Sequence, residues 1–298
     1  MPELPEVETI RRDLIAAITL KKISVVKLLS EKIAKNKAAF FIYFLTNRTV
    51  KGVYRRGKLL IFELSKKKSE KDSHFLIIHL KMTGQLILMG KKKNIIGGHS
   101  LNEDYSSDVV GLNLPSKHTR AQFIFSNGDI LYFNDLRRFG YLQIVTSSEL
   151  EKIKKENYGP EPLTKDFTVD YLTRVLKKKT ANIKSILLNQ KIVAGLGNIY
   201  VDEALFLAGI RPSRFVKDIN KKELIKLHHS INKIIEKAIA KRGTTFNNYV
   251  DSSGRRGNFS KLLQVYGRAK KPCTVCKEPI MKIKVAGRGT HYCPKCQK

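Results

Sequence analysis

Acidic residues, cysteines and long apolar runs are all scarce in this chain of 298 residues. No apolar run approaches the roughly 18 residues that a membrane-spanning helix needs, which argues against an integral membrane protein. The first residues are acidic and include prolines, whereas a secretory signal peptide begins with positive charge. We therefore expect a cytoplasmic protein with no membrane partner.

The shortage of acidic residues leaves a large positive charge. Lysine and arginine number 57 against 26 aspartate and glutamate residues, so the formal net charge is +31 at pH 7. Such an excess predicts a polyanionic partner, with nucleic acid the first candidate and an anionic membrane surface the second. We interpret the lysine tracts 66–68 and 91–93 as solvated loops. The length is typical of about two domains.

Cysteine is absent from the first 272 residues and then occurs as two Cys-x-x-Cys pairs, with sixteen residues between them. Two such pairs at this spacing fit a tetrahedral zinc site with four thiolate ligands. Disulfides or a redox pair are the alternative, which a reducing compartment disfavours. Because four thiolates leave no coordination position open, we expect one structural zinc ion that folds a small hairpin, and no catalytic cofactor. The ligands would be Cys273, Cys276, Cys293 and Cys296.

The first half of the chain predicts a β-sandwich or flattened barrel preceded by a helix over 5–18. Ser126-Asn127-Gly128-Asp129 indicates a hairpin turn, whereas 91–117 is polar and irregular and reads as a surface loop or insertion. The strands are expected in segments rich in β-branched and aromatic residues: 23–29, 39–45, 49–54, 58–64, 75–80, 121–125, 130–133 and 141–145.

The second half has helical periodicity. Asn220 and Glu223 have the spacing of a capping box at the start of a helix, and Gly243 is a plausible end for it. Further helices are expected over 183–188 and up to Ala208.

Two glycine-containing segments of this half are candidates for binding. The turn at 195–198 (GLGN) exposes N–H groups at a helix start, where a phosphate can bind. Residues 243–259 have the composition of a mobile lid, or equally of a plain linker. The resulting fold class is α+β with several domains: a β-sandwich at 1–146, a linker at 147–162, a helical domain at 163–259 and a zinc hairpin at 260–298.

The amino end can supply a nucleophile. Removal of Met1, which a small second residue favours, would leave Pro2 with a free secondary amine. An α-amino group has a pKa of about 8, so a useful fraction is uncharged at neutral pH, and its attack on an aldehyde-level carbon gives a cationic iminium. Glu3 and Glu6 supply carboxylates for proton transfer. A structural reading is compatible with this one, because Pro5 and Glu6 also suit the first turn of a helix that would hold the terminus in place.

Several motifs together resemble those of the bacterial formamidopyrimidine-DNA glycosylase family, whose members remove 8-oxoguanine and ring-opened purines from DNA. The resemblance covers nearly the whole chain. It implies base excision repair on double-stranded DNA with oxidised purines or abasic sites, a monomer associated with the bacterial nucleoid, and a helix-two-turn-helix domain at 163–259. The motifs are 2–9 (PELPEVET), 57–58 (GK), 79–84 (HLKMTG), 134–140 (NDLRRFG), 195–205 (GLGNIYVDEAL), 265–268 (VYGR) and 287–290 (GRGT) with the zinc module.

The resemblance also implies a mechanism. The damaged nucleotide is flipped out of the stack, the Pro2 nitrogen attacks C1′ and displaces the base, and Glu3 acts as general acid or base with support from Glu6. Lys58 is then implied in β-elimination of the 3′ phosphate. Arg288 is implied in the δ-elimination that releases the 5′ side.

The DNA contacts that the resemblance implies are of two kinds. Met82, Arg137 and Phe139 fill the space that the flipped base leaves. Phosphate and further DNA contacts come from residues elsewhere in the chain, namely His79, His118, Asn198, Tyr266 and one lysine of 177–179, with Lys178 and Lys179 the candidates. Residues 243–259 match the lid over the flipped base.

The chain departs from the usual family pattern at three places. Leu136 stands where proline is usual, Lys270 stands where glycine is usual, and 91–117 is longer than the common form. None of these positions belongs to the proposed catalytic groups, and it is the insertion and the lid sequence that leave the lesion preference open. An endonuclease VIII-like glycosylase for oxidised pyrimidines is the nearest alternative, which Leu4 and residues 7–9 disfavour. A zinc-containing DNA-binding protein without catalysis would explain the charge and the cysteines but not Pro2.

Overall fold

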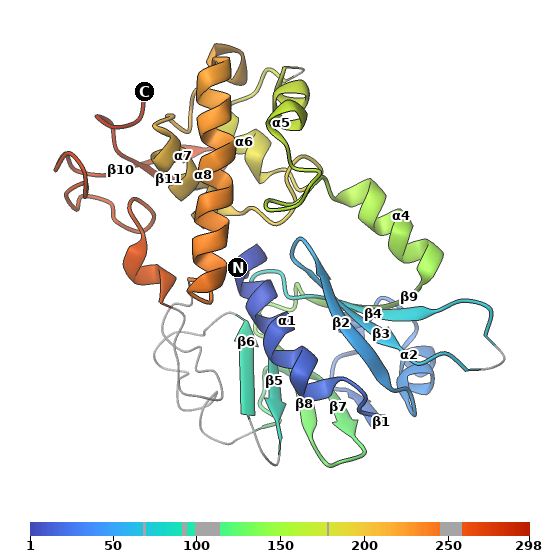
Figure 1. The fold of residues 1–298 in the computed structure, drawn as a ribbon. Helices are drawn as coiled ribbons and strands as arrows, with labels where there is room; N and C mark the ends of the chain where they lie inside the picture. The colour runs from blue at the N-terminus through green and yellow to red at the C-terminus, as the bar shows by residue number, and fades with distance from the viewer. Residues whose placement is uncertain (68–69, 91–93, 99–113, 178, 245–257) are drawn as a thin grey trace. The chain divides into compact units, whose positions relative to one another are not determined.

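The computed structural model describes residues 1–67, 70–90, 94–98, 114–177, 179–244 and 258–298 (Figure 1). The chain forms two compact units, Met1–Lys154 with Arg242–Asn258 and Lys155–Lys241 with Phe259–Lys298. Arg242–Asn258 thus groups with the first unit, whereas the sequence pattern assigns 243–259 to the helical domain. The domain boundaries drawn from the sequence stay a prediction.

The first unit opens with α1 (Leu4–Ile18), which confirms the predicted helix. A proline in the first turn costs no hydrogen bond, because the N–H groups there have no partner within the helix. The N–H of Glu3, just before the helix, donates to Glu6 Oε2 at 2.8 Å, as in a capping box. The apolar face of α1 is fully buried and comprises Val7, Ile10, Leu14 and Ile18.

Two antiparallel sheets, of order β1-β7-β8-β5-β6 and β2-β3-β4-β9, make up the body of this unit. Apolar residues of both sheets and of α1 form one core, and α1 contacts β6 and β2 (Figure 1). The approach is close, since a Cβ on Gly97 would lie 2.5 Å from Ile10 Cγ1. The strands are β1 (Ile23–Leu28), β2 (Val50–Arg56), β3 (Leu59–Leu64), β4 (His74–His79), β5 (Gly84–Met89), β6 (Asn94–Gly98), β7 (Thr119–Phe125), β8 (Ile130–Asp135) and β9 (Tyr141–Thr146).

One predicted strand is wrong. The segment 39–45 lies in a helix, α2 (Ala38–Leu45). It buries Phe41, Phe44 and Leu45 and exposes Phe40 and Tyr43. The buried residues are thus three and four positions apart, as on one face of a helix. A short continuous apolar run has no period of its own, so propensity alone could not distinguish the two structures.

Two further segments differ from expectation. β6 lies inside the stretch expected to be an irregular loop, where its two glycines hide the strand signal. α4 (Ser147–Asn157) occupies most of the expected linker, and Leu150 is its one buried apolar residue. Because α4 is so polar, its sequence has no apolar residues at helical spacing from which a helix could be predicted.

The second unit is helical, with α5 (Val169–Leu176), α6 (Ile183–Leu188), α7 (Asn198–Ala208) and α8 (Lys221–Ala240). The helices predicted over 183–188 and up to Ala208 are confirmed, as is the capping box, in which Asn220 and Glu223 exchange hydrogen bonds of 2.9 and 3.0 Å. α7 is almost wholly buried and packs against α8 (Figure 1).

A hairpin of β10 (Met281–Val285) and β11 (Arg288–Tyr292) completes the second unit and confirms the α+β class with a four-cysteine zinc hairpin. Short 3-10 turns lie at η1 (Glu31–Ile33), η3 (Val216–Asp218) and η4 (Phe259–Leu262). Within the described residues, no helix is both long enough and apolar enough to cross a bilayer.

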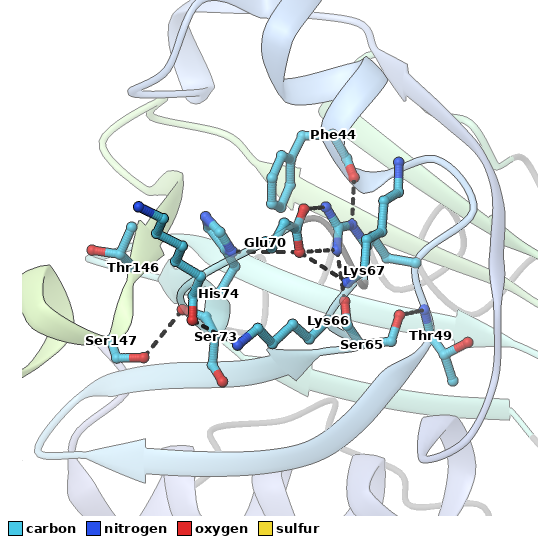
Figure 2. A network of polar contacts seen from close by, with 12 residues as sticks. Phe44, Thr49, Ser65, Lys66, Lys67, Glu70, Ser73, His74, Thr146 and Ser147 are labelled. Carbon is cyan, nitrogen blue, oxygen red and sulfur yellow. Dashed lines mark hydrogen bonds and ion pairs between the residues drawn. The ribbon is translucent and has the colours of Figure 1, made fainter.

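An ion pair between the buried Arg48 and the partly buried Glu70 lies in the first unit away from its amino end (Figure 2). The Arg48 guanidinium lies 4.2 Å from the centre of the Phe44 ring. It donates to Ser65 O at 2.7 Å and to the Glu70 carboxylate. Arg48 also holds the pKa of Glu70 at about 2. These contacts join the end of α2 to the segment between β3 and β4, and we assign them a structural role.

Candidate active site

The amino end of the first unit is buried beside its carboxylates. Met1 is the exposed residue, whereas Pro2 and Glu3 are buried. Burial lowers the pKa of the terminal amine, that of Met1, below its ordinary value of 8.0, and the positive charge of Lys58 acts in the same direction, while Glu3 and Glu6 oppose the shift. The structure therefore brings this amine, Glu3, Glu6 and Lys58 within electrostatic reach of one another.

Glu6 is held from two sides. Its Oε2 accepts the N–H of Glu3 at 2.8 Å, and its Oε1 accepts the N–H of Thr244 at 2.7 Å and the Thr244 hydroxyl at 3.0 Å. Gly243 lies against it with a φ of 82°, and a Cβ there would lie 2.6 Å from Glu6 Oε1. The supporting part predicted for Glu6 agrees with this geometry, and Thr244 is a residue that sequence reasoning missed.

Lys58 is the second residue of a two-residue turn between β2 and β3. Gly57 precedes it with a φ of 56°, the conformation that a type II′ turn requires at its first central position. The lysine is only 5% exposed. A tight turn thus presents a buried lysine toward the amino end of α1.

His79 ends β4 and is uncharged at neutral pH. Burial lowers the pKa of His79 to about 3, and the charges of Lys81 and Lys58 add to the effect. Its Nδ1 accepts the N–H of Lys81 at 2.9 Å. An acceptor role for Nδ1 puts the ring proton on Nε2, so His79 can act as a neutral hydrogen-bond donor toward DNA.

The three residues assigned to the space of the flipped base lie together. Met82 is 37% exposed and Phe139 is 52% exposed. Arg137 joins them, because its Nη1 lies 3.1 Å from Met82 Sδ and its guanidinium lies 4.7 Å from the centre of the Phe139 ring. Exposed apolar side chains flanking a cation form a wedge that can enter a base stack.

Asp135 ties together the two loops that carry this wedge. Its carboxylate, which is fully buried, accepts the N–H of Arg137 at 3.2 Å, the N–H of Gly140 at 2.7 Å and the Thr83 hydroxyl. The Asp135 N–H in turn donates to His118 O at 2.9 Å. The predicted phosphate contact His118 therefore lies next to the base of the wedge. Asp135 belongs to the 134–140 motif, but the sequence alone indicated no role for it.

In the second unit, α7 carries Asn198 at its start. Asn198 Nδ2 donates to Gly289 O at 2.9 Å, so its side chain contacts the zinc hairpin. Arg288, the residue directly before Gly289, is exposed at the start of β11. It follows a turn in which Ala286 and Gly287 both have positive φ, 50° and 72°. Asn198 and Arg288 are therefore close neighbours.

Buried charges fix the hairpin to α7. Asp202 Oδ2 accepts the N–H of His291 at 2.9 Å, and its Oδ1 accepts from Lys184 Nζ at 2.6 Å. The Glu203 carboxylate accepts three N–H groups, those of Gln264, Val265 and Tyr266, at 2.8–2.9 Å. The sequence indicated no role for these acids, because their partners lie 18 to 89 residues away and no short pattern connects them.

Tyr266, Lys178 and Lys179 are the three remaining predicted DNA contacts of the second unit. The Tyr266 ring is partly buried and lies 5.1 Å from that of His291, edge on. Lys179 is exposed, and its N–H donates to Leu176 O at 2.8 Å. Lys178 lies outside the described residues, as do 245–257 of the predicted lid and most of the 91–117 insertion.

The four cysteines form a metal centre. Their Sγ atoms all lie within 4.8 Å of one another, and all four are free thiols. The S···S distances of 3.4 Å for Cys276 with Cys293 and 3.9 Å for Cys273 with Cys296 far exceed a disulfide bond of about 2.05 Å. Four thiolates so placed are the donor set of tetrahedral zinc, with no position left for chemistry. The cluster fits one structural zinc ion, and the disulfide alternative does not hold.

Known proteins match the whole chain. Residues 1–142 match the formamidopyrimidine-DNA glycosylase N-terminal domain, 158–249 its H2TH domain and 270–298 the zinc finger found in FPG and IleRS. The formamidopyrimidine-DNA glycosylase of Pelotomaculum thermopropionicum is 38% identical over 300 residues, covering 100% of this chain and 99% of its own.

Solved structures agree with the sequence comparison. One is a complex of wild-type Lactococcus lactis Fpg with DNA that contains an N7-benzyl-Fapy-dG, with a TM-score of 0.85, 36% identity and full coverage of both chains. Another is a complex of the same protein with DNA containing an abasic site, with a TM-score of 0.85, 36% identity and 99% coverage of both chains.

Proposed function

Because this chain belongs to the formamidopyrimidine-DNA glycosylase family, we propose that Pro2, exposed by removal of Met1, is the nucleophile of its two activities. The chain is a DNA glycosylase and abasic-site lyase of base excision repair. One observation supports the assignment to Pro2: it is buried directly before Glu3, and the amine of the adjacent Met1 lies within electrostatic reach of Glu3, Glu6 and Lys58. An uncharged amine at neutral pH is what nucleophilic attack requires.

Base removal comes first. The Pro2 nitrogen forms a bond to C1′ while the glycosidic bond breaks, and the departing base takes up a proton. Glu3 is the acid or base that we assign to the sugar, as the family motif implies, and Glu6, which accepts hydrogen bonds from the N–H groups of Glu3 and Thr244, supports the site. Opening of the sugar ring leaves an iminium between Pro2 and C1′.

Strand cleavage follows from that iminium. Its positive charge acidifies the C2′ proton, and loss of this proton expels the 3′ phosphate. Lys58 is the buried base that we assign to this step. A second elimination expels the 5′ phosphate, and Arg288, exposed at the tip of the zinc hairpin, is assigned to it. Hydrolysis of the remaining conjugated iminium returns the amine.

The substrate is double-stranded DNA with an oxidised purine or an abasic site. Two observations support DNA as the partner: the wedge of Met82, Arg137 and Phe139 is exposed, and the net charge is +31. His118, Asn198 and Lys179 are the proposed phosphate contacts, with His79 and Tyr266 as further contacts to DNA. The zinc site holds the hairpin that carries Arg288 and takes no part in the chemistry. The enzyme would act in the cytoplasm, on the nucleoid.

Trapping with borohydride tests this function, because reduction converts the iminium into a stable covalent adduct. Duplexes carrying 8-oxoguanine or an oxidised pyrimidine are compared. We expect preferential trapping on 8-oxoguanine, and no adduct for Pro2→Gly or for protein that retains Met1, as judged by intact mass. Preferential trapping on the pyrimidine would move the chain to the endonuclease VIII-like alternative. No adduct with either lesion would leave a zinc-containing DNA-binding protein.

A further inference from the structure

One arginine connects α1 with the turn that presents Lys58. Arg55, the second-last residue of β2, places its Nε 3.1 Å from Glu8 Oε2. Its Nη1 donates to Gly57 O at 3.0 Å. The same guanidinium thus contacts the helix that begins at the amino end and the residue immediately before Lys58.

These contacts are sheltered from solvent. The side chains of Glu8 and Arg55 are 9% and 12% exposed. Salt screens partly buried pairs much less than surface pairs. A planar guanidinium also offers several donors in fixed directions, which a lysine ammonium cannot reproduce. The link is therefore rigid in direction as well as in length.

We propose that Glu8 and Arg55 are positioning residues that hold the β2–β3 turn, and with it Lys58, at a fixed distance from the nucleophilic end of α1. The inference rests on the proposed function, since it assumes that Lys58 acts on an intermediate bound at Pro2. Glu8 lies on the same helix as Glu6, and Glu3 directly precedes that helix, so a shift of the turn would change the separation of Lys58 from all of them. Electrostatics agrees, because the charge of Lys58 lowers the pKa of both the terminal amine and His79.

The chain offers a matched control for a merely structural role. Arg11 also binds Glu8, with Nε and Nη2 donating at 3.0 and 2.8 Å, but from three residues further along the same helix. Arg11→Gln therefore removes a comparable ion pair while the Glu8–Arg55–Gly57 connection persists.

The experiment measures two single-turnover rates: base release from an 8-oxoguanine duplex and strand cleavage of a preformed abasic duplex. We expect Arg55→Gln to slow strand cleavage by roughly tenfold, since misplacement of a catalytic group by about 1 Å can cost up to a hundredfold. Base release should fall less, and Arg11→Gln should stay within about twofold of wild type for both rates. Arg55→Lys should not restore cleavage. Glu8→Gln, which leaves the bond from Arg55 to Gly57 in place, is the second variant should Arg55→Gln fold poorly.

A second comparison separates positioning from stability. If Arg55 acts through Lys58, then Arg55→Gln should cost nothing further in a Lys58→Ala background. Multiplicative losses would overturn the inference, and so would equal cleavage rates for Arg55→Gln and Arg11→Gln. Thermal melts of each variant confirm that the assays are run on folded protein. Absence of trapping by the wild-type enzyme would instead overturn the proposed function, and this inference with it.

Discussion

Thr244 donates two hydrogen bonds to one oxygen of Glu6, from its backbone N–H at 2.7 Å and from its hydroxyl at 3.0 Å. The other oxygen of Glu6 accepts the N–H of Glu3 at 2.8 Å. Thr244, 238 positions away in the sequence, thus helps to set the orientation of the Glu6 carboxylate in the first turn of α1. Glu6 is therefore a positioning group in our account, and proton transfer is assigned to Glu3.

Adding a methyl group at Gly243 should displace Glu6. The residue has a φ of 82°, which strains an alanine by about 1–3 kcal/mol, and its new Cβ would lie 2.6 Å from Glu6 Oε1. We expect Gly243→Ala to form the borohydride adduct roughly tenfold more slowly. Thr244→Ser keeps both donors and should match wild type. Trapping by Gly243→Ala at the wild-type rate would show that the position of Glu6 is unimportant.

Replacing Asp135 by asparagine should loosen the wedge. The asparagine NH₂ group cannot accept from a backbone N–H, so at least one donor of the two loops is left buried without a partner. Each such group costs about 1–3 kcal/mol, and we expect a lower melting temperature with weaker binding to lesion DNA. Thr83→Val removes a hydroxyl that donates to Asp135 and accepts the Arg137 N–H at 3.0 Å, while the N–H groups of Arg137 and Gly140 keep the Asp135 carboxylate as acceptor. A Thr83→Val variant as damaged as Asp135→Asn would contradict the assigned role.

His79 should not titrate in the physiological range. Its pKa is lowered to about 3, chiefly by burial, and a lowered histidine pKa means that the folded protein excludes the proton. We expect the His79 ring signals in NMR to stay constant from about pH 5 to pH 8, where an ordinary histidine with a pKa near 6.5 changes charge. A His79→Gln spectrum assigns the signals among the seven histidines. A midpoint near 6.5 would refute a neutral His79.

The ionised Glu8 carboxylate should stabilise the folded protein at neutral pH and lose this effect in acid. Hydrogen bonds from Arg11, Arg12 and Arg55 hold the pKa of Glu8 at about 2, against an ordinary value of 4.5. A lowered carboxylate pKa contributes stability that is full above 4.5 and is lost as the pH falls toward 2. Urea titrations at several pH values should show Glu8→Gln less stable than wild type near pH 6, with the gap closing below pH 4.5. A constant gap would exclude this linkage.

Local signals predicted much of the fold. The proline and glutamate at the start of α1, the Asn220 capping box and the spacing of the cysteines each act over a few residues, so sequence alone exposes them. α2 and α4 were missed because the one is uniformly apolar and the other almost uniformly polar. Without a period, neither carries the signal that distinguishes a helix from a strand or a linker.

The site divides in the same way. The chemistry of a terminal amine pointed to Pro2, whereas Lys58, Arg288 and the wedge were assigned through family motifs, and all of these roles stay predictions. The contacts that position the site were not found from the sequence, because each joins residues that are distant in the chain. Thr244 binds Glu6, and Arg55 binds Glu8. Such pairs leave no short pattern in the chain and become visible only in the folded structure.

The most direct test locates the covalent bond. Wild-type enzyme is trapped with borohydride on an 8-oxoguanine duplex, digested with nuclease and protease, and mapped by mass spectrometry. We predict that the sugar remnant lies on the nitrogen of Pro2, in an amino-terminal peptide that lacks Met1. A remnant on a lysine such as Lys58, or on a peptide that retains Met1, would contradict the account.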